Sequence, residues 1–285
     1  MGHRSALLAH SLIMAGVEEE EQINYIDLAN ATVKRYGGDI PGEIATWFYK
    51  SFPVQSLVWV RENTRACYYF ENKNGFLWKD NKEIIGFKTH SKTHPINAQK
   101  ERGAVTSVTL PTNRLCAVLK GNTVLSIKDL DISNSYATVV VTLKFSNKVL
   151  STKQQVYGNW HRALTAYGSE FMIYGAGDGG QERETKIKPP HGFDEWITIW
   201  IQWGTVNYPT SHVYLITENV SVDKSFIASP KIEQRQLFVG ALPDGSEGFV
   251  GSIAALEVYT STERFLSNDL RKNIIEDHQR IVRKM

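Results

Sequence analysis

The chain has 285 residues, of which 42% are hydrophobic and 22% are charged, and its formal net charge is +2. This length exceeds the ~100–200 residues of an ordinary single domain and predicts one large domain plus a smaller N-terminal region. Lys and Arg are scattered along the chain, which argues against a basic face for nucleic acid, and no apolar run approaches the ~20 residues of a membrane span.

Residues 1–40 are predicted to form a helical arm. Apolar side chains recur at roughly helical spacing from residue 5 to residue 36, interrupted by the acidic run Glu18–Glu21. The first apolar run is short and contains His10, so it makes a poor secretory signal. We therefore expect a protein without a classical signal peptide, located on a virion or extracellular surface, with the cytoplasm as the alternative.

Residues 41–100 are predicted to form a small aromatic-rich β region followed by a linker. Short aromatic and β-branched runs alternate with turn residues, and Asn74–Gly75 is expected to be a hairpin turn because both residues tolerate positive φ. The aromatic side chains either pack in a core or offer a platform for sugar stacking. Residues 88–103 are polar and aperiodic, which is typical of a linker.

Residues 101–265 are predicted to form an antiparallel β-sandwich, because many short strands follow one another with no helix between them. The segment WITIWIQW alternates, which places Ile197, Ile199, Ile201 and Trp203 on one apolar face toward the core. The predicted strands are SVTLP, LCAVLK, TVLSI, ATVVVTLKF, EFMIYG, WITIWIQW, HVYLITENV, RQLFVGAL and GSIAALEVYT.

Residues 266–285 are predicted to contain an amphipathic helix. Ser267 is a suitable N-cap, and Leu270, Ile274 and Ile281 lie on one apolar stripe. This stripe must dock on the sandwich, on the N-terminal region or on another subunit.

The two cysteines, Cys67 and Cys116, lie far apart in the sequence and lack the spacing of metal ligands. One disulfide and two free buried thiols are both compatible with this count. The cysteines therefore do not assign a redox compartment.

Three segments of the sandwich region carry a family pattern. They are FDEWITIWIQW (Phe193–Trp203), QLFVGALPDG (Gln236–Gly245) and FVGSIAALEVY (Phe249–Tyr259). Over about residues 104–265 they resemble laminin G-like domains of the concanavalin A-like lectin and glucanase superfamily. The resemblance implies a mainly β fold, an antiparallel jelly-roll β-sandwich. Gly240 and Gly251 are expected where strands of a curved sheet leave little room for a side chain.

The superfamily includes glycoside hydrolases, which need two carboxylates ~5–9 Å apart across the sugar bond. The hydrolase-like pattern Glu-x-Asp-x-x-Glu is absent from the sequence, and the neighbours Asp194 and Glu195 would face opposite ways on a strand. Glu182 and Glu184 have the required alternation, but their segment, GGQERETKIKPP, is predicted to be a loop. We therefore predict a protein without catalytic residues.

Many laminin G-like domains bind Ca²⁺ at the rim of the sandwich, so the resemblance implies a candidate calcium site. Asp129, Asp131 and Asn134 alternate in the segment KDLDISNS and would supply the oxygen ligands that Ca²⁺ requires. The same residue types are common in ordinary turns, and both alternatives stay open.

The candidate ligand-binding residues are Trp160, His161, Arg162, Tyr167 and Asp178. They come from the segment YGNWHRALTAYG and the glycine-rich loop GAGDGG, which are expected to share one rim. An aromatic ring can stack on the apolar face of a sugar while Arg and Asp hydrogen-bond its hydroxyls. The alternative is that Trp160 packs in the core and the loop only connects strands.

The sequence thus predicts a non-catalytic recognition or structural protein, such as a virion or phage surface or fibre component, that binds a glycan or a protein surface. We expect a homo-oligomer or part of a larger assembly, because weak single contacts gain avidity from copies. No nucleic-acid partner and no cofactor besides calcium is expected. The alternatives are a carbohydrate-active enzyme of the same superfamily, a glycoside hydrolase or lyase, and an extracellular matrix or adhesion module.

Overall fold

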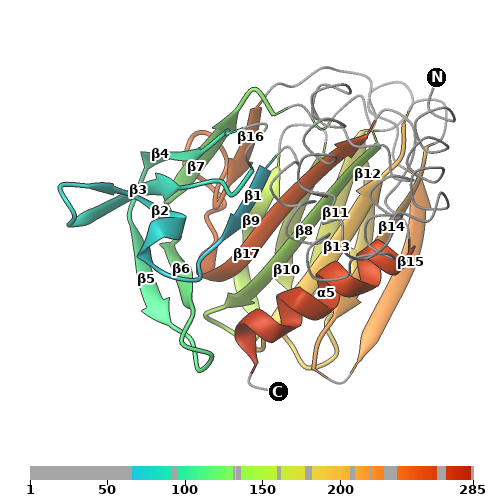
Figure 1. Cartoon of the computed structure of the whole chain (residues 1–285). Coiled ribbons are helices and arrows are strands. Elements are labelled where there is room, and N and C mark those ends of the chain that lie inside the picture. The colour runs from blue at the N-terminus through green and yellow to red at the C-terminus, as the bar shows by residue number, and fades with distance from the viewer. Residues whose placement is uncertain are drawn as a thin grey trace, which may run out of the picture.

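The structure, a computed structural model, describes residues 66–91, 95–130, 132, 136–158, 162–176, 182–205, 209–218, 220–227, 236–261 and 268–283. This part of the chain is mainly β, with antiparallel strands and one α-helix, α5 (Asn268–Val282) (Figure 1). The predicted fold class is confirmed for these residues, while the predicted arm over residues 1–40 lies outside them. No described helix has the length and hydropathy that crossing a bilayer requires.

Seventeen strands and one 3-10 turn are described. They are β1 (Ala66–Tyr69), η1 (Lys73–Gly75), β2 (Phe76–Lys79), β3 (Glu83–Phe87), β4 (Ala98–Arg102), β5 (Val105–Thr109), β6 (Leu115–Lys120), β7 (Val124–Lys128), β8 (Tyr136–Phe145), β9 (Leu150–Gly158), β10 (Arg162–Gly168), β11 (Glu170–Ala176), β12 (Glu182–Ile187), β13 (Ile197–Trp203), β14 (Thr210–Ile216), β15 (Ser221–Ile227), β16 (Gln236–Val239) and β17 (Val250–Ser261).

The strands form one curled sheet with two facing layers (Figure 1). The front layer has the order β15–β14–β13–β8–β17, and β17 continues on its other edge to β6 and β1. The back layer has the order β12–β11–β10–β9–β16–β7–β4. β3 pairs with both β4 and β5 and so joins the layers along one side.

On the opposite side of the sandwich, β12 and β15 each pair with one described strand, β11 and β14 respectively. These two strands belong to different layers. The ammonium group of Lys224 on β15 reaches across and donates a hydrogen bond to the backbone carbonyl of Lys186 on β12, with an N···O distance of 3.2 Å. On this side of the sandwich, the observed link between the layers is therefore a hydrogen bond from a side chain and not backbone pairing between strands.

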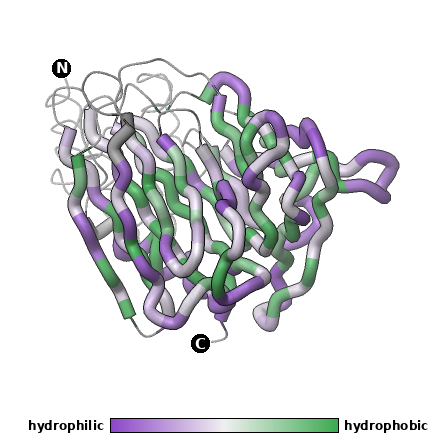
Figure 2. Tube along the Cα trace, turned by 180° about the vertical axis from the view of Figure 1, so that it is seen from behind, coloured by the Kyte–Doolittle hydropathy of each residue, from purple (hydrophilic) through white to green (hydrophobic). Residues whose placement is uncertain are grey.

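The core lies between the layers and is built from alternating strand residues. Ile197, Ile199, Ile201 and Trp203 of β13 all belong to it and are fully buried, which confirms the predicted alternation. Hydrophobic and hydrophilic residues also alternate along the back-layer strands (Figure 2). At one end, four phenylalanine rings pack against one another in tilted and edge-on arrangements, with centroids 4.7–5.9 Å apart: Phe145, Phe171, Phe193 and Phe249.

Two glycines are required by close backbone approach, as predicted. Gly240 has a φ of +94°, and a Cβ there would lie 2.5 Å from the backbone oxygen of Thr123. A Cβ on Gly251 would lie 2.3 Å from the backbone oxygen of Lys144. Either side chain would force neighbouring strands apart.

The predicted hairpin at Asn74–Gly75 is wrong. β1 pairs with β17 and β2 pairs with β3, so the turn at this position passes the chain between different strand partners. The actual hairpin joins β2 to β3 through Asp80 and Asn81, whose φ values are 52° and 55°. Two consecutive positive φ values suit a tight turn between twisted strands, and Asp and Asn tolerate them better than most residues.

Several strands lie where the sequence indicated loops or a linker. The polar segment 88–103 contains β4, which pairs with β7, and the segment that holds Glu182 and Glu184 forms β12. β9 and β10 were likewise not predicted. Their residues are polar on one side, and pairing with neighbours distant in sequence satisfies the backbone.

The C-terminal helix docks on the outer side of the front layer, so its apolar stripe packs on the sandwich, the first of the three predicted alternatives (Figure 1). α5 packs on β8, β13 and β17, and Ile274, Ile281 and Val282 are buried. The Arg271 guanidinium lies 3.7 Å from the centroid of the Tyr214 ring on β14. The helix, Asn268–Val282, lies within the predicted range 266–285.

Neither cysteine forms a disulfide, and both are buried. Burial raises the pKa of the Cys116 thiol above its ordinary value, although hydrogen bonds with Ser252 and the Val108 backbone oppose this. The thiolate is the reactive form, so both inaccessibility and protonation protect this side chain.

We expect neither thiol of the native protein to react with Ellman's reagent at pH 8. A free cysteine with a pKa of about 8.5 would react readily at that pH, whereas the raised pKa of Cys116 leaves less thiolate. Unfolding in guanidinium chloride should expose both thiols, and the signal of the unfolded protein then gives the value expected for two reactive thiols. Rapid labelling of Cys116 in the native protein would contradict this account.

Candidate functional site

The two described members of the predicted ligand-binding set, Arg162 and Tyr167, do not lie together. Trp160, His161 and Asp178 lie outside the described residues, so their placement stays a prediction. Arg162 and Tyr167 lie at opposite ends of β10, because Arg162 pairs with Gly175 and Tyr167 pairs with Glu170. Arg162 is fully buried whereas the Tyr167 residue is 54% exposed. The two therefore cannot contact one small ligand together.

Arg162 has a structural role in place of the predicted contact with sugar hydroxyls. It faces the core on β10, on the same side as Leu164 and Ala166. Its guanidinium donates to the backbone carbonyls of Ile132 and Gly204, the latter at 2.6 Å. These bonds tie β10 to the segments that follow β7 and β13, and they offset part of the cost of burying the guanidinium charge.

Of the three residues predicted to bind calcium, the structure describes only Asp129. Asp129 is exposed and has a φ of 58°, which is typical of a turn. Asp131 and Asn134 lie outside the described residues. Among the residues that the structure does describe, no group of three or more His, Cys, Asp or Glu side chains could hold a metal ion.

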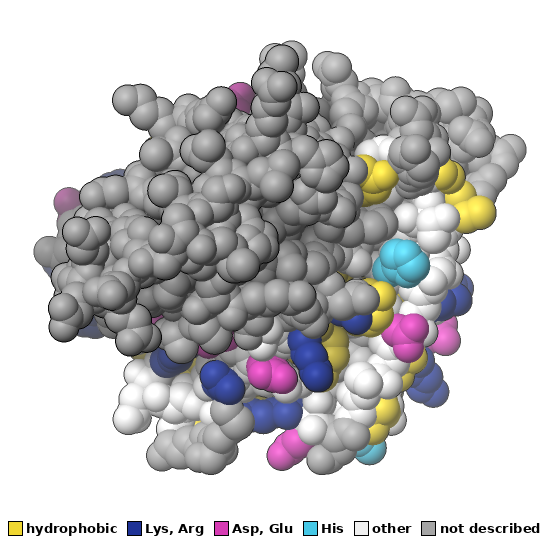
Figure 3. Space-filling view, turned by 45° about the vertical axis from the view of Figure 1, so that its right-hand side comes forward, with side chains coloured by type: hydrophobic (Ala, Val, Ile, Leu, Met, Phe, Trp, Pro, Cys, Tyr) yellow, Lys and Arg dark blue, Asp and Glu magenta, His cyan; other side chains and the backbone are white. Residues whose placement is uncertain are grey.

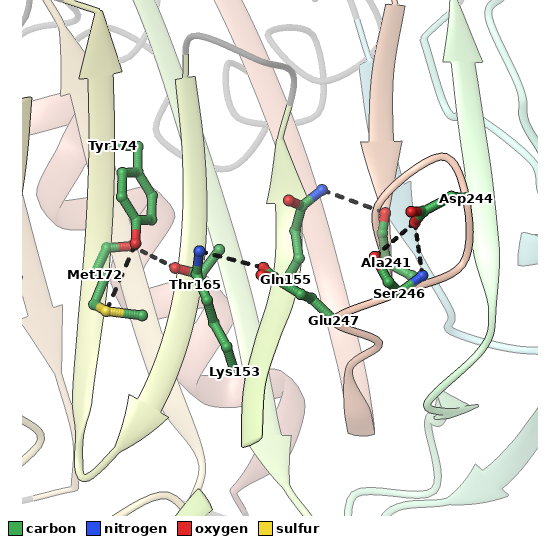
Figure 4. Close-up of polar contacts among 9 residues, drawn as sticks. All are labelled: Lys153, Gln155, Thr165, Met172, Tyr174, Ala241, Asp244, Ser246 and Glu247. Carbon is green, nitrogen blue, oxygen red and sulfur yellow. Dashed lines mark hydrogen bonds and ion pairs between the residues drawn. The ribbon is translucent and has the colours of Figure 1, made fainter. Parts of the chain in front are cut away.

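A different surface gathers the polar and aromatic groups that the sequence analysis sought. It is the outer face of β9, β10, β11 and β12, on the side of the molecule opposite α5 (Figure 4). We call it the β9–β12 face. Its exposed or half-buried side chains are Lys153, Tyr167, Tyr174, Glu184 and Lys186, with Glu247 from the loop between β16 and β17, and they surround the buried residues Gln155, Thr165 and Met172.

Opposite charges alternate across this face around one aromatic ring. Lys153 Nζ lies 3.4 Å from Glu247 Oε2 and 4.9 Å from the centroid of the Tyr174 ring. On the other side of Tyr174, Glu184 Oε1 lies 3.2 Å from Lys186 Nζ. The Tyr174 hydroxyl also donates to the sulfur of Met172, 3.7 Å away. The result is a row of donors and acceptors that runs across β9, β11 and β12.

The pKa values of this row reflect the mutual contacts. Partial burial acts to lower the pKa of Lys153, but the interactions with Tyr174 and Glu247 outweigh it and raise that pKa above its ordinary value. Burial raises the pKa of Tyr174, and Glu184 adds to this while Lys153 opposes it. Lys153 is therefore a cation and Tyr174 a neutral phenol at physiological pH.

The loop that supplies Glu247 is held by its own hydrogen bonds. Asp244 accepts from the backbone N–H and the hydroxyl of Ser246, at 2.8 and 2.6 Å. Gln155 donates its side-chain amide to the Ala241 carbonyl (3.3 Å) and its backbone N–H to the Glu247 carbonyl (2.5 Å) (Figure 4). Glu247 has a φ of 51°, a left-handed conformation that costs about 1 kcal/mol or more and is common at functional sites.

The sequence analysis proposed one residue of this face, Tyr167, as a ligand contact, weighed Glu184 only as part of a carboxylate pair in a predicted loop, and missed the others. Met172 and Tyr174 lie in a predicted strand, EFMIYG, and their alternation could have placed them on one face. Lys153 and Glu184 come from strands that were not predicted. Which strands are neighbours depends on pairings that the local sequence does not encode.

A second group of polar side chains lies under α5, and its hydroxyl, imidazole and carboxylate follow one another as in a catalytic triad. His278 Nδ1 lies 2.8 Å from the Thr142 hydroxyl and His278 Nε2 lies 3.1 Å from Glu257 Oε1. The Tyr259 hydroxyl donates to the other oxygen of Glu257. A hydroxyl, an imidazole and a carboxylate in this sequence could activate a nucleophile. Thr142, Glu257 and His278 are each fully buried, so no substrate can reach the hydroxyl, and the group is structural.

We expect the single substitution His278→Leu to destabilise the fold by about 3–5 kcal/mol, because it leaves Glu257 buried without its partner. The double variant Glu257→Met/His278→Leu should regain most of that loss, since a buried pair can be replaced by apolar side chains at little cost. Urea unfolding of the two variants and the parent protein measures both changes. A double variant as unstable as the single one would contradict this interpretation.

The fold is similar to solved structures, although the sequence matches no protein-family model and no curated protein. A botulinum neurotoxin serotype D binding domain superposes with a TM-score of 0.51 at 13% identity, over 76% of this chain and 52% of that one. A botulinum neurotoxin type C structure has a TM-score of 0.51 at 8% identity, over 78% and 52%. A GH54 α-L-arabinofuranosidase has a TM-score of 0.52 at 11% identity, over 77% and 63%.

At these identities the similarity shows the fold alone, which resembles concanavalin A-like lectin domains. The chain spans about half the length of the neurotoxin binding domains that it matches. The fold predicted from the laminin G-like segments is thus supported by solved structures, whereas membership of a sequence family is not shown.

Proposed function

We propose that the protein is a non-catalytic recognition protein that binds a glycan through the β9–β12 face of its lectin-like sandwich. The observation that carries the proposal is the combination of an exposed aromatic ring, Tyr167, with the amines and carboxylates that surround Tyr174 on the same face. Tyrosine rings stack on the apolar faces of sugars, and charged side chains make strong hydrogen bonds to hydroxyls.

The neurotoxin structures support a glycan as the ligand. Cell entry of botulinum neurotoxin type C is described as dependent upon interaction with two ganglioside molecules, and a binding domain of neurotoxin DC was solved in complex with SialylT. This chain matches about half of those domains. Glycan binding by the shared half is therefore part of the proposal and needs its own test.

The mixed charge on the described part of the surface seen in Figure 3 argues against a nucleic-acid site on that side of the molecule. On the described part of the face seen in Figure 3, Lys and Arg side chains lie among Asp and Glu side chains. A nucleic-acid site would need clustered cations to neutralise phosphates. A single sugar site of this kind binds weakly, so several copies of the chain on a virion or extracellular surface would raise the avidity.

A glycan array tests this proposal. Tyr167→Ala should weaken binding of any glycan recognised by the parent protein about tenfold, because loss of a stacking ring costs on the order of 1.4 kcal/mol. Val108→Ala is the matched control, since Val108 is also 54% exposed but lies on β5.

Trp160→Ala separates the β9–β12 face from the originally predicted rim. If Trp160→Ala abolishes binding and Tyr167→Ala does not, the rim is the glycan site and the β9–β12 face is not. Absence of any glycan signal from the native protein would contradict glycan recognition altogether.

A carbohydrate-active enzyme is the second candidate, because the fold also resembles an arabinofuranosidase. Glu182 and Glu184, two positions apart, both belong to β12 and not to a loop. The Glu184 side chain lies on the β9–β12 face beside Tyr174 and Lys186. A strand holds a pair of carboxylates in place more rigidly than a loop does. The placement of Glu182 and Glu184 on β12 therefore favours the carbohydrate-active enzyme more than the sequence alone did.

Hydrolysis of an aryl α-L-arabinofuranoside distinguishes the two candidates. We expect the parent protein to release no more phenol than buffer does, since we assign no catalytic carboxylates. Turnover that falls at least a hundredfold in Glu184→Gln, with folding and thermal stability retained, would establish the enzyme and overturn the non-catalytic proposal. Glu170→Gln, on the neighbouring strand β11, is the matched control.

A further inference from the structure

Both ammonium groups of the β9–β12 face already have a carboxylate beside them. A carboxylate oxygen of Glu247 lies 3.4 Å from the Lys153 ammonium, and one of Glu184 lies 3.2 Å from the Lys186 ammonium. Tyr174 lies between the two pairs and interacts with both Lys153 and Glu184. The charges of this row therefore compensate one another, and a ligand anion would have to compete with a carboxylate for either ammonium group.

Glu247 is held beside Lys153 by its backbone. The Glu247 carbonyl accepts the backbone N–H of Gln155 at 2.5 Å, and the next residue, Gly248, forms an isolated bridge with Gln155. Only a rotation of the side chain could take the Glu247 carboxylate away from the face, and this rotation would break the ion pair with Lys153. Any ligand group that approaches the Lys153 ammonium therefore also meets the Glu247 carboxylate.

The ion pair of Lys153 and Glu247 can make further hydrogen bonds. An ammonium group has several donors and a carboxylate has several acceptor sites. The Lys153 side chain is 37% exposed and the Glu247 side chain is 29% exposed, so both groups can be reached from solvent. A sugar hydroxyl is both a donor and an acceptor, as a serine hydroxyl is. Two adjacent hydroxyls of one sugar can therefore accept from Lys153 and donate to Glu247 at the same time.

A sugar that carries a carboxylate or a sulfate group would meet a less favourable balance of charge. Its negative group could reach either ammonium only next to the carboxylate that is already paired with that ammonium. A like charge within about 4–6 Å opposes the charged form of a group, and an exposed ion pair contributes only about 0–1 kcal/mol. The repulsion therefore offsets the attraction, whereas an uncharged sugar adds hydrogen bonds without adding charge.

We propose that the β9–β12 face binds an uncharged glycan, in which two adjacent hydroxyls bridge Lys153 and Glu247, and that Glu247 disfavours glycans with a negative charge. This inference rests on the proposed function and adds the chemical class of the glycan to it. The Tyr167 ring, 54% exposed on the same face, supplies a stacking contact without charge. Since no net ion pair forms on binding, the affinity should depend little on salt.

A glycan array with matched derivatives on the full chain tests the class of the ligand. Each glycan that carries a carboxylate is compared with its own methyl ester, which has nearly the same size and no charge. We expect the ester to bind at least about tenfold more tightly than the carboxylate, a ratio that corresponds to about 1.4 kcal/mol. The affinity for the ester should change less than about twofold between about 0.1 M and about 1 M NaCl, although the screening length falls from about 10 Å to about 3 Å.

Glu247→Gln tests the role of the negative charge at this position. The substitution keeps the length of the side chain and one acceptor oxygen, but it frees the Lys153 ammonium for a ligand anion. We expect the ratio of ester affinity to carboxylate affinity to fall to about one or below. Glu101→Gln is the matched control, because Glu101 on β4 forms the same kind of pair with Lys128 on β7, at 3.8 Å, and lies outside the face. The control should keep the ratio of the parent protein.

The possible results separate this inference from the proposed function. If the parent protein binds carboxylate glycans as tightly as their methyl esters, the uncharged class is wrong, while glycan recognition by the face still stands. If folded Glu247→Gln keeps the parent ratio, Glu247 does not select against charge. If Glu247→Gln does not fold, the comparison on the parent protein alone decides the class. Absence of binding to every glycan would contradict both the proposed function and this inference.

Discussion

The rest of the structure depends on the need to bury three central strands on both faces. β8, β13 and β17 are nearly continuous in apolar residues, and β8 pairs along its length with the other two. Strands of this kind cannot leave one face in water. The facing back layer covers their inner side, and α5 covers Thr142, Thr198 and Glu257 on their outer side. The helix is thus part of the sandwich architecture and not an appendage.

Elements with a local physical signature could be predicted from the sequence. The alternation of β13, the apolar stripe of α5 and the close approach at Gly240 and Gly251 each follow from side-chain period or size. The pairing of β1 with β17 could not, because its partners are nearly 190 residues apart in sequence and no local pattern joins them. β9, β10 and β12 could not be predicted for the same reason. Polar residues on their outer side are also typical of loops, and only the neighbouring strands show that these segments belong to a sheet.

The candidate sites show why residue types alone identify function poorly. Arg162 was assigned to a ligand, yet its charge is satisfied by carbonyls from two segments remote in sequence. His278 and Glu257 have the chemistry of a catalytic pair, but their complete burial makes them part of the helix interface. Exposure, which the sequence does not give, separates these groups from the row around Lys153 and Tyr174, where solvent and a ligand have access.

The Lys224 contact on the open side of the sandwich has a consequence for how copies of this chain can associate. A strand with an unoccupied ladder edge can recruit a strand from another molecule, which leads to uncontrolled polymerisation. By placing an ammonium group on the β12 carbonyl of Lys186, the chain occupies an acceptor that an incoming strand would need and adds a charge that would have to be desolvated. This margin of the molecule is therefore a poor template for the addition of a strand from another molecule.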